Sequence, residues 1–351
     1  MNAKHKRIAI IGPYPPPFGG ISVHIQRILT YLPEQVYDLY NVSGTSGRGK
    51  KFRGFRKYFY IFAFLFRSYT IIHYHSTSKR IRLLLSLIAI FKKGIYLHLH
   101  GASFSDTIHE KSLYAYSLKR LLKYVNILAS NETIYNEISG YGPGSIAYID
   151  AFIPPKFDRE QYDRIIGHLT LPRADVLILM IGWFAYYNNQ DLYGFDLMLN
   201  ALRTLKVEKH YHVRTIASVN GIKDRECYDH FLKRREELNL IDDFILISGD
   251  LEEIYPLFLH SDIFVRPTNT DGNAVSIKEA LWFDCRVIAS DAVVRPPGVV
   301  LFENRNHEDL SDKIEGLIRT PVKLALKERI ERAQNHKTYQ PKLLKIYGLE
   351  K

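Results

Sequence analysis

The chain has 351 residues, of which 46% are hydrophobic, with a formal net charge of +11 and two cysteines. This length predicts two domains, and the composition excludes a disordered chain. Cys227 and Cys285 lie far apart with no His or Cys at metal-ligand spacing, which argues against a disulfide framework or structural zinc and indicates a reducing compartment. Since no apolar segment of signal-peptide length precedes the first strand, we expect a cytoplasmic protein.

Apolar runs of strand length alternate with helical patterns along the whole chain. This alternation predicts an α/β protein with two doubly wound parallel sheets that have helices on both faces. In the first half the predicted strands are Arg7–Gly12, Tyr37–Val42, Thr70–His75, Gly94–His98, Val125–Ser130 and Ile146–Ile149. In the second half they are Asp175–Gly182, His212–Val219, Asp243–Gly249, Asp262–Arg266, Arg286–Ala289 and Val299–Phe302.

Paired prolines mark the expected boundary between the two halves. The segment Asp150–Pro155 reads as a linker because paired prolines interrupt regular structure. We therefore expect domains at 1–155 and 156–336, followed by a tail helix at 337–351 that returns to the first domain. Ligands of such sheets bind beyond the carboxyl ends of the strands, so a cleft between the domains is the expected site.

The positive charge lies in the first half of the chain. Residues 1–155 contain 20 Lys and Arg against 7 Asp and Glu, and no acidic residue occurs between Asp38 and Asp106. Two amphipathic helices are expected in this stretch, one of them at 79–93, and their apolar runs are far shorter than the ~20 residues that span a bilayer. The other helix carries phenylalanines at helical spacing: Phe52, Phe55, Phe59, Phe62 and Phe66.

Two interpretations of this basic, aromatic region compete. Core helices of an α/β domain explain the apolar faces, but they leave the missing acidic residues unexplained. We therefore expect the region 48–93 to lie partly on the anionic inner face of the cell membrane. Nucleic acid ranks well below the membrane, because the sequence has no nucleic-acid-binding motif.

Two carboxylates lie eight positions apart around a glycine turn. Pro267 ends the predicted strand, and the chain then runs Asp271-Gly272-Asn273-Ala274-Val275-Ser276-Ile277-Lys278-Glu279. Asn273 is the expected N-cap of a helix over 274–283, whose free N–H groups would attract phosphate or sugar oxygens. Glu279, about one and a half turns into the helix, could accept hydrogen bonds from ribose hydroxyls. Taken alone, an Asp in a turn and a Glu on a solvated helix face would be the simpler interpretation.

Three further motifs follow predicted strands of the first half. Gly19-Gly20 precedes a helix expected to begin near Ser22, and a lone Gly-Gly is usually just a turn. His98 and His100 point the same way because side chains in a strand alternate. His73 and His75 are interpreted as structural. Glu132 either lines a ligand site or caps the helix that follows it.

The order of these motifs resembles family 4 of the retaining glycosyltransferases, which have the GT-B fold of two Rossmann-like domains. The segment 271–279 resembles that family's E-x7-E signature, with Asp at the first position, and the sequence from Ala280 to Asp291 resembles its next helix end and strand. The segment from Arg7 to His24 resembles the opening strand and double-glycine loop. The resemblance covers nearly the whole chain.

The resemblance implies transfer of a sugar from a nucleotide-diphospho-sugar donor to a lipid-linked or saccharide acceptor, with retained configuration. It implies that Glu279 binds ribose, that Asp271 and His100 hold the sugar, and that the turn at Gly249 and Leu251 holds the base. The departing phosphate would accept the acceptor proton, and no metal or other cofactor is expected. The implied catalytic residues are His100, Asp271 and Glu279. The implied donor-binding residues are Gly19, Gly20, Gly182, Gly249, Leu251, Arg266, Gly272, Asn273, Ala274, Val275, Ser276, Lys278 and Glu279.

The sequence departs from the family pattern in the loop between Gly182 and Gly194. Relatives place an Arg after the first glycine and a Lys before the second, and these clamp the diphosphate, whereas this chain has Trp183 and Tyr193. Neutralisation of the diphosphate would then come from elsewhere, helped by the amides near 272–276. The candidate basic residues are Arg266, Lys278, Lys223 and Arg225.

Two other functions remain open. A GT-B sugar-nucleotide epimerase would have no need of the basic, aromatic region. A catalytically silent nucleotide-sugar-binding partner subunit would account for the missing Arg and Lys.

Overall fold

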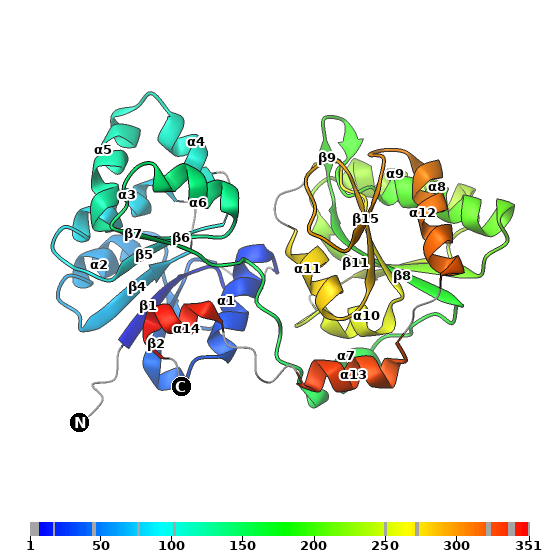
Figure 1. Cartoon of the computed structure of the whole chain (residues 1–351), viewed down its shortest axis with the longest axis horizontal. Coiled ribbons are helices and arrows are strands. Elements are labelled where there is room, and N and C mark those ends of the chain that lie inside the picture. Colours follow the sequence, from blue (N-terminus) through cyan, green and yellow to red (C-terminus); the bar gives the residue numbers. More distant parts are fainter. Residues whose placement is uncertain are drawn as a thin grey trace. The chain divides into compact units, whose positions relative to one another are not determined.

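Two parallel β-sheets divide the chain into two units (Figure 1). The computed structural model describes residues 7–16, 18–43, 47–75, 78–100, 103–248, 251–270, 274–320, 324–335 and 341–349. Unit 1 comprises Met1–Ile153 and Tyr339–Lys351, and unit 2 comprises Pro154–Thr338.

The sheet of unit 1 has the strand order β3-β2-β1-β4-β5-β6-β7, and all neighbouring pairs are parallel. Successive residues of its central strand β1 pack into cores on opposite faces, Ile8 and Ile10 on one side and Ala9 and Ile11 on the other. Burial on both faces explains why these strands read as continuous apolar runs. The strands are β1 (Arg7–Gly12), β2 (Tyr37–Asn41), β3 (Lys50–Lys51), β4 (Tyr69–Tyr74), β5 (Ile95–Leu99), β6 (Asn126–Ala129) and β7 (Ser145–Tyr148).

Helices cover both faces of this sheet (Figure 1). Helices α1 and α14 pack on one face, and the remaining helices of unit 1 pack on the other. They are α1 (Gly20–Thr30), α2 (Arg56–Ala63), α3 (Lys79–Ile88), α4 (Ser103–His109), α5 (Leu113–Leu121), α6 (Glu132–Ser139) and α14 (Lys342–Tyr347).

The sheet of unit 2 has the order β12-β11-β8-β13-β14-β15, again with parallel pairs throughout. A separate antiparallel hairpin is formed by β9 and β10. The strands are β8 (Val176–Phe184), β9 (Tyr186–Tyr187), β10 (Gln190–Asp191), β11 (Val213–Ile222), β12 (Phe244–Ser248), β13 (Ile263–Arg266), β14 (Arg286–Ser290) and β15 (Val299–Phe302).

In unit 2, helices α8, α9 and α12 cover one face of the sheet, and α7, α10, α11 and α13 cover the other. The buried Arg329 of α13 donates hydrogen bonds to the carbonyls of Phe258, Ser261 and Phe283, which fixes the ends of α10 and α11. The helices are α7 (Arg159–Gly167), α8 (Phe195–Arg203), α9 (Arg225–Glu237), α10 (Tyr255–His260), α11 (Val275–Trp282), α12 (His307–Arg319) and α13 (Leu326–Asn335).

Every predicted strand is present, with small differences at the ends. The two-residue strands β3, β9 and β10 were not predicted, because pieces this short carry no hydrophobic period. The predicted phenylalanine helix is shorter than expected. It begins at Arg56 because the chain first passes through β3 and then through Gly54, whose φ of 59° lies in the left-handed region.

Candidate functional site

The carboxyl edge of the unit 2 sheet gathers most of the predicted donor-binding residues. Its strands are parallel, so their carboxyl ends lie at one edge. Gly182 lies near the end of β8, Arg266 is the last residue of β13, and Leu251 follows β12. This is the edge at which open α/β sheets bind ligands.

Helix α11 begins just beyond β13 at this edge. Its N-cap is Ala274, one residue later than the predicted cap Asn273, and among the described residues no side chain makes a capping hydrogen bond to it. Ala274, Val275 and Ser276 are half-buried, so the backbone at the start of this helix remains near the surface. The first N–H groups of a helix have no partner within it, which makes such a start attractive to an anion.

Glu279 lies on the second turn of α11 and is 4% exposed. The carboxylate of Glu279 therefore does not lie on a solvent-exposed face of the helix. The neighbouring Lys278 is half-buried. Four predicted site residues, Gly249, Asp271, Gly272 and Asn273, lie outside the residues that the structure describes.

Trp183, at one of the positions where the resemblance implies a cation, lies against β11. The register of β8 and β11 pairs it with Gly221, where an added Cβ would come within 2.5 Å of the indole ring. The Nζ of the exposed Lys223, just beyond β11, lies 4.8 Å from the centre of that ring. A cation–π contact thus places an ammonium group over this aromatic residue.

Tyr193, at the second such position, also has a cation over it. The Arg266 guanidinium lies 5.1 Å from the centre of the Tyr193 ring, and its Nη1 donates to the Ile181 carbonyl at 3.1 Å. A Cβ on Gly182 would come within 2.7 Å of the same ring. The absence of a side chain at Gly182 therefore leaves space for the Tyr193 ring. That ring makes the cation–π contact with Arg266 at the end of β13.

The segment that precedes Tyr193 forms a hairpin, β9 and β10, that the sequence did not predict. Asn188 and Asn189 form its turn with φ of 51° and 57°, the pattern of a two-residue hairpin turn. The Asp191 carboxylate accepts the N–H groups of Tyr193 and Asp196, at 3.0 and 3.1 Å. Burial, followed by the nearby Asp196 carboxylate, raises the pKa of Asp191 to about 6.

The remaining candidate, Arg225, is engaged within its own helix. Its Nε lies 3.0 Å from a carboxylate oxygen of Asp229, and its guanidinium lies over the ring of Tyr228. Among the described contacts, Lys223 and Arg266 are thus the cations that lie over the two aromatic residues of the loop.

The sequence analysis also missed residues that hold the chain between β13 and α11. Arg295 donates to the Thr268 hydroxyl at 3.2 Å and to the Ser290 carbonyl at 3.0 Å. The N–H of Asn269 donates to the Leu192 carbonyl, while its Oδ1 is buried with no hydrogen-bond partner among the described residues. A buried acceptor without a partner is costly, so a ligand donor at this edge would stabilise it. No sequence pattern distinguishes these residues from ordinary loop residues.

In unit 1, Gly19 and Gly20 begin α1, two residues earlier than predicted. Gly19 is the N-cap, and its N–H donates to the Ser22 hydroxyl at 2.9 Å. A Cβ on Gly20 would meet no described atom within 4 Å, so this backbone is open to approach. In α6, Asn131 is the capping residue, whereas Glu132 lies exposed in the first turn.

Five histidines meet in the interior of unit 1. His73 and His75 come from the end of β4, His98 and His100 from the end of β5, and His24 from α1. The His98 and His100 ring centroids are 4.1 Å apart, and His24 lies 4.8 Å from His100 and 4.9 Å from His98. The sequence placed His98 and His100 on one side of a strand but gave no sign of His24. Four of the five, His24, His75, His98 and His100, form a group that could hold a metal ion.

Burial keeps these histidines neutral. It lowers the pKa of His24 to about 4, and together with the neighbouring imidazoles it lowers the pKa of His73, His75, His98 and His100 well below 6.5. Of the charged groups near His24, Arg27 lowers its pKa and Asp150 raises it.

We expect the protein to lose stability as the pH falls below about 6.5. In that range the unfolded chain binds protons that the folded cluster excludes, so each histidine that stays neutral lowers the free energy of unfolding by at most about 1.4 kcal/mol per pH unit. For His24 the loss continues to about pH 4. Urea unfolding between pH 7.5 and 5, with a chelator present, measures this slope. A stability that stays flat over this range would contradict the neutral cluster.

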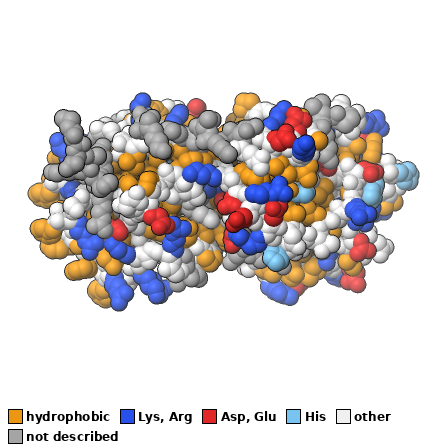
Figure 2. All heavy atoms as spheres, turned by 90° about the horizontal axis from the view of Figure 1, so that it is seen from below, with side chains coloured by type: hydrophobic (Ala, Val, Ile, Leu, Met, Phe, Trp, Pro, Cys, Tyr) orange, Lys and Arg blue, Asp and Glu red, His pale blue; other side chains and the backbone are white. Residues whose placement is uncertain are grey.

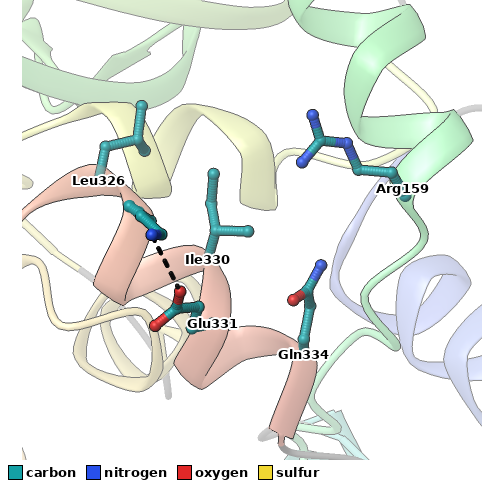
Figure 3. Close-up of a pocket in the computed structure, with 6 residues that line it drawn as sticks. Arg159, Leu326, Ile330, Glu331 and Gln334 are labelled. Atoms are coloured by element: carbon teal, nitrogen blue, oxygen red, sulfur yellow. Dashed lines mark ion pairs between the residues drawn. The ribbon is translucent and has the colours of Figure 1, made fainter.

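A groove in unit 2 lies away from the predicted donor-binding residues. It has a volume of about 390 Å³ and is lined by Arg159 of α7 and by the α13 residues Leu326, Lys327, Ile330, Glu331 and Gln334. In Figure 3 Arg159 faces the side chains of α13, and an ion pair joins Lys327 to Glu331. None of the described residues predicted to bind the donor lines this groove.

Unit 1 exposes a row of large hydrophobic side chains beside basic residues. On and around α2, Phe55, Phe59, Phe62 and Phe66 are 92%, 66%, 62% and 77% exposed. Figure 2 shows hydrophobic and basic side chains intermixed over the surface of unit 1, at the left, with few acidic ones in view. Phe52, in contrast, is buried. These four side chains follow one another at helical spacing and form an apolar face. No described part of unit 1 covers this face.

The end of α3 continues this surface. Lys92 donates to the Arg67 carbonyl at 2.6 Å, which brings the end of α3 beside the chain that follows α2. Phe91 is 82% exposed there, and Ile90 is also exposed. Among the described helices, none is long and apolar enough to cross a membrane.

Comparison with known proteins agrees with this architecture. Residues 175–320 match the model of the family glycosyl transferases group 1. No curated protein matches the sequence.

Solved structures resemble the chain over nearly its whole length. A glycosyltransferase from Rickettsia africae is 15% identical with a TM-score of 0.62, covering 95% of this chain and 93% of that one. The Anabaena protein HepE in complex with UDP is 12% identical with a TM-score of 0.63, covering 94% of both chains. WaaG, a glycosyltransferase involved in lipopolysaccharide biosynthesis, is 13% identical with a TM-score of 0.55, covering 95% of both. The chain has the GT-B fold, and over residues 175–320 it matches the glycosyl transferases group 1.

Proposed function

We propose that the protein is a retaining glycosyltransferase of the family 4 type. It takes a sugar from a nucleotide-diphospho-sugar and transfers it to a lipid-linked or saccharide acceptor in polysaccharide or glycolipid assembly. The family match of unit 2 and the UDP held by the similar HepE structure support a nucleotide-sugar donor, with UDP-sugars the first to test.

The observation that carries the proposal is the buried carboxylate of Glu279. It lies one and a half turns into the helix that follows β13, within the segment matched by the family model. A carboxylate is an acceptor of hydrogen bonds, and a ribose offers two hydroxyl donors, so the pair is chemically matched. Burial makes such bonds stronger than they are in water.

In our proposal Lys223 and Arg266 neutralise the donor diphosphate in place of the missing loop cations. Both lie at the carboxyl edge, held by cation–π contacts with Trp183 and Tyr193. The backbone N–H groups at the start of α11 add further donors. The charges of Lys223 and Arg266, together with these N–H groups, would stabilise the leaving nucleoside diphosphate, so the proposed step uses no metal ion.

The proposed reaction breaks the bond between the anomeric carbon and the diphosphate oxygen. The acceptor oxygen bonds to that carbon on the same face, and its proton passes to the departing phosphate oxygen. No protein nucleophile is then required. Asp271 and, on unit 1, His100 are the proposed sugar ligands, as the resemblance implies.

We further propose that unit 1 binds the cytoplasmic face of the cell membrane peripherally. The exposed row Phe55, Phe59, Phe62 and Phe66 can enter the interface between headgroups and acyl chains, while neighbouring basic residues meet anionic headgroups. A lipid-linked acceptor would be reached at this surface. The part that WaaG plays in lipopolysaccharide biosynthesis supports this kind of acceptor.

Replacing Lys223 with Ala should weaken the binding of nucleotide-diphospho-sugars by about 10-fold, because a charge-assisted hydrogen bond to phosphate is lost. Since Lys223 is exposed, the fold should be unaffected. Isothermal titration with a UDP-sugar measures the effect. Arg225→Ala is the matched control, because that arginine pairs with Asp229 of its own helix. Equal losses in both variants would mean that general surface charge, not a clamp at Lys223, binds the diphosphate.

An assay of sugar transfer to an acceptor tests the proposed function. The protein is incubated with radiolabelled nucleotide-sugars and membrane lipid extract or oligosaccharides. The label should enter an acceptor with the anomeric configuration of the donor, as read by NMR. Release of free sugar without any acceptor product would instead favour the epimerase or hydrolase alternative.

A further inference from the structure

We propose that His24, His75, His98 and His100 bind one divalent transition-metal ion, best matched by Zn²⁺, in the interior of unit 1. Each imidazole offers one ligand atom, and these atoms all lie within 4.8 Å of one another. Zinc at its usual distance of ~2.0–2.1 Å from histidine nitrogens sets four tetrahedral ligands about 3.3 Å apart. The pair His75 Nδ1 and His100 Nε2 is already at 3.1 Å. Small side-chain shifts would bring the others to this spacing.

Unpartnered nitrogens are the second line of evidence. His24 Nε2, His75 Nε2 and both ring nitrogens of His98 are buried, and none has a hydrogen-bond partner among the described residues. Burying such groups unpaired is costly, and native interiors contain few of them. Because each imidazole gives one nitrogen to the ion, an ion bound through His75 Nδ1 and His100 Nε2 would also satisfy His24 Nε2 and one of the two His98 nitrogens.

The contacts around His24 prepare it as a ligand. Its Nδ1 lies 2.7 Å from the Ala151 carbonyl, which can only accept a hydrogen bond. Nδ1 therefore carries the proton, and Nε2 keeps a free lone pair. Metal-bound histidines are commonly oriented in this way, by donation of the other ring N–H to a carbonyl.

His73 is not one of the four proposed ligands, but its contacts help to hold them in place. His73 Nδ1 lies 2.5 Å from the Tyr347 hydroxyl of α14, and the His73 ring stacks on His98 at an interplanar angle of 9°. His73 thus fixes the position of His98 and ties α14 to the cluster.

The donor set selects the kind of ion. The group contains four imidazoles and no carboxylate, which suits Zn²⁺, Co²⁺, Ni²⁺ or Cu²⁺ and disfavours Mg²⁺ or Ca²⁺. The positive charge of Arg27 lowers the pKa of His24, and that of Arg82 lowers the pKa of His100. The same charges would repel a cation bound by electrostatic attraction alone, so coordination by the imidazole nitrogens would have to hold the ion. The ion would link α1 to β4 and β5, and so fix the helix that begins at Gly19-Gly20. The role of the ion is structural: it would hold His100 through Nε2, the nitrogen that faces His75, and leave Nδ1 of His100 for the proposed contact with the sugar.

Cobalt provides a test that is independent of glycosyl transfer. The full chain, without a polyhistidine tag, is freed of metal with a chelator and titrated with Co²⁺. We expect about one ion per chain with the intense visible absorption of tetrahedral Co²⁺, bleached by one equivalent of Zn²⁺. His24→Asn keeps a donor near the Nδ1 position but removes the ligand Nε2, so it should weaken Co²⁺ binding by more than the ~10–100-fold typical of an outer-shell change.

His230→Asn is the matched control, because His230 lies exposed on α9. It should bind Co²⁺ as the unmodified protein does. No binding, or weak octahedral spectra that are the same in all three proteins, would overturn the metal site. The spectrum of the unmodified protein decides the question even if His24→Asn fails to fold.

Discussion

Glu279→Gln is expected to weaken nucleotide-sugar binding by about 10–100-fold, which is the largest single-residue effect in the donor site. Glutamine keeps the shape of the side chain but loses the charge that strengthens hydrogen bonds from ribose hydroxyls, worth about 1.5–3 kcal/mol. Turnover should fall at least as far, because the donor would be held less well in the transition state. Isothermal titration and transfer assays measure the two effects separately.

Asp262→Asn is the matched control for Glu279→Gln. Asp262 is also a buried carboxylate, but it directly precedes β13, at the opposite end of the strand from Arg266, and it accepts the Leu177 N–H at 2.7 Å. This change should lower stability and leave donor affinity intact. Equal losses of affinity in both variants would show that general destabilisation of unit 2, not a ribose contact, explains the effect.

We expect a variant with serine in place of Phe59, Phe62 and Phe66 to bind anionic vesicles at least ~30-fold more weakly than the unmodified protein. Full burial of one phenylalanine stabilises by about 1.5–3 kcal/mol, and even half of this for each of the three rings gives about 2.3–4.5 kcal/mol. Because the three side chains are 62–77% exposed, the fold should keep its stability. Cosedimentation with vesicles of phosphatidylglycerol and phosphatidylcholine measures the change.

Two controls accompany this variant. Serine at Val207, Ile241 and Val294 removes exposed apolar side chains from unit 2 and should leave vesicle binding unchanged. Raising the salt should weaken binding of the unmodified protein, because basic residues contribute through screened charge. If the phenylalanine variant sediments with vesicles as the unmodified protein does, the membrane surface lies elsewhere.

Most of the sheet architecture could be predicted from the sequence, since buried parallel strands are written as continuous apolar runs. The predicted strand Asp262–Arg266 is found as β13 at Ile263–Arg266, and Arg7–Gly12 is found as β1 with the same bounds. The hairpin at Asn188 and Asn189 was missed because its strands are two residues long. Asn-Asn is also a weaker turn signal than the Asn-Gly that usually marks such a hairpin.

The candidate site was less predictable, because its contacts depend on strand register. Lys223 lies over Trp183 because β11 and β8 are parallel neighbours that pair Gly221 with Trp183. Nothing local to either residue indicates this pairing. The histidine group likewise requires the ends of β4 and β5 to lie side by side and α1 to pack nearby, so His24 could not be recognised from its sequence neighbours.

The central claim is that unit 2 binds a nucleotide-sugar at the carboxyl edge of its sheet. The most direct test is titration of the purified protein with UDP-, GDP-, dTDP- and ADP-linked sugars, read as a rise in the thermal midpoint. Because a ligand that binds the folded state stabilises it, our account predicts a rise with one nucleotide class that Glu279→Gln diminishes. No rise with any of these donors would contradict the account, and a catalytically silent partner subunit would then be the better interpretation.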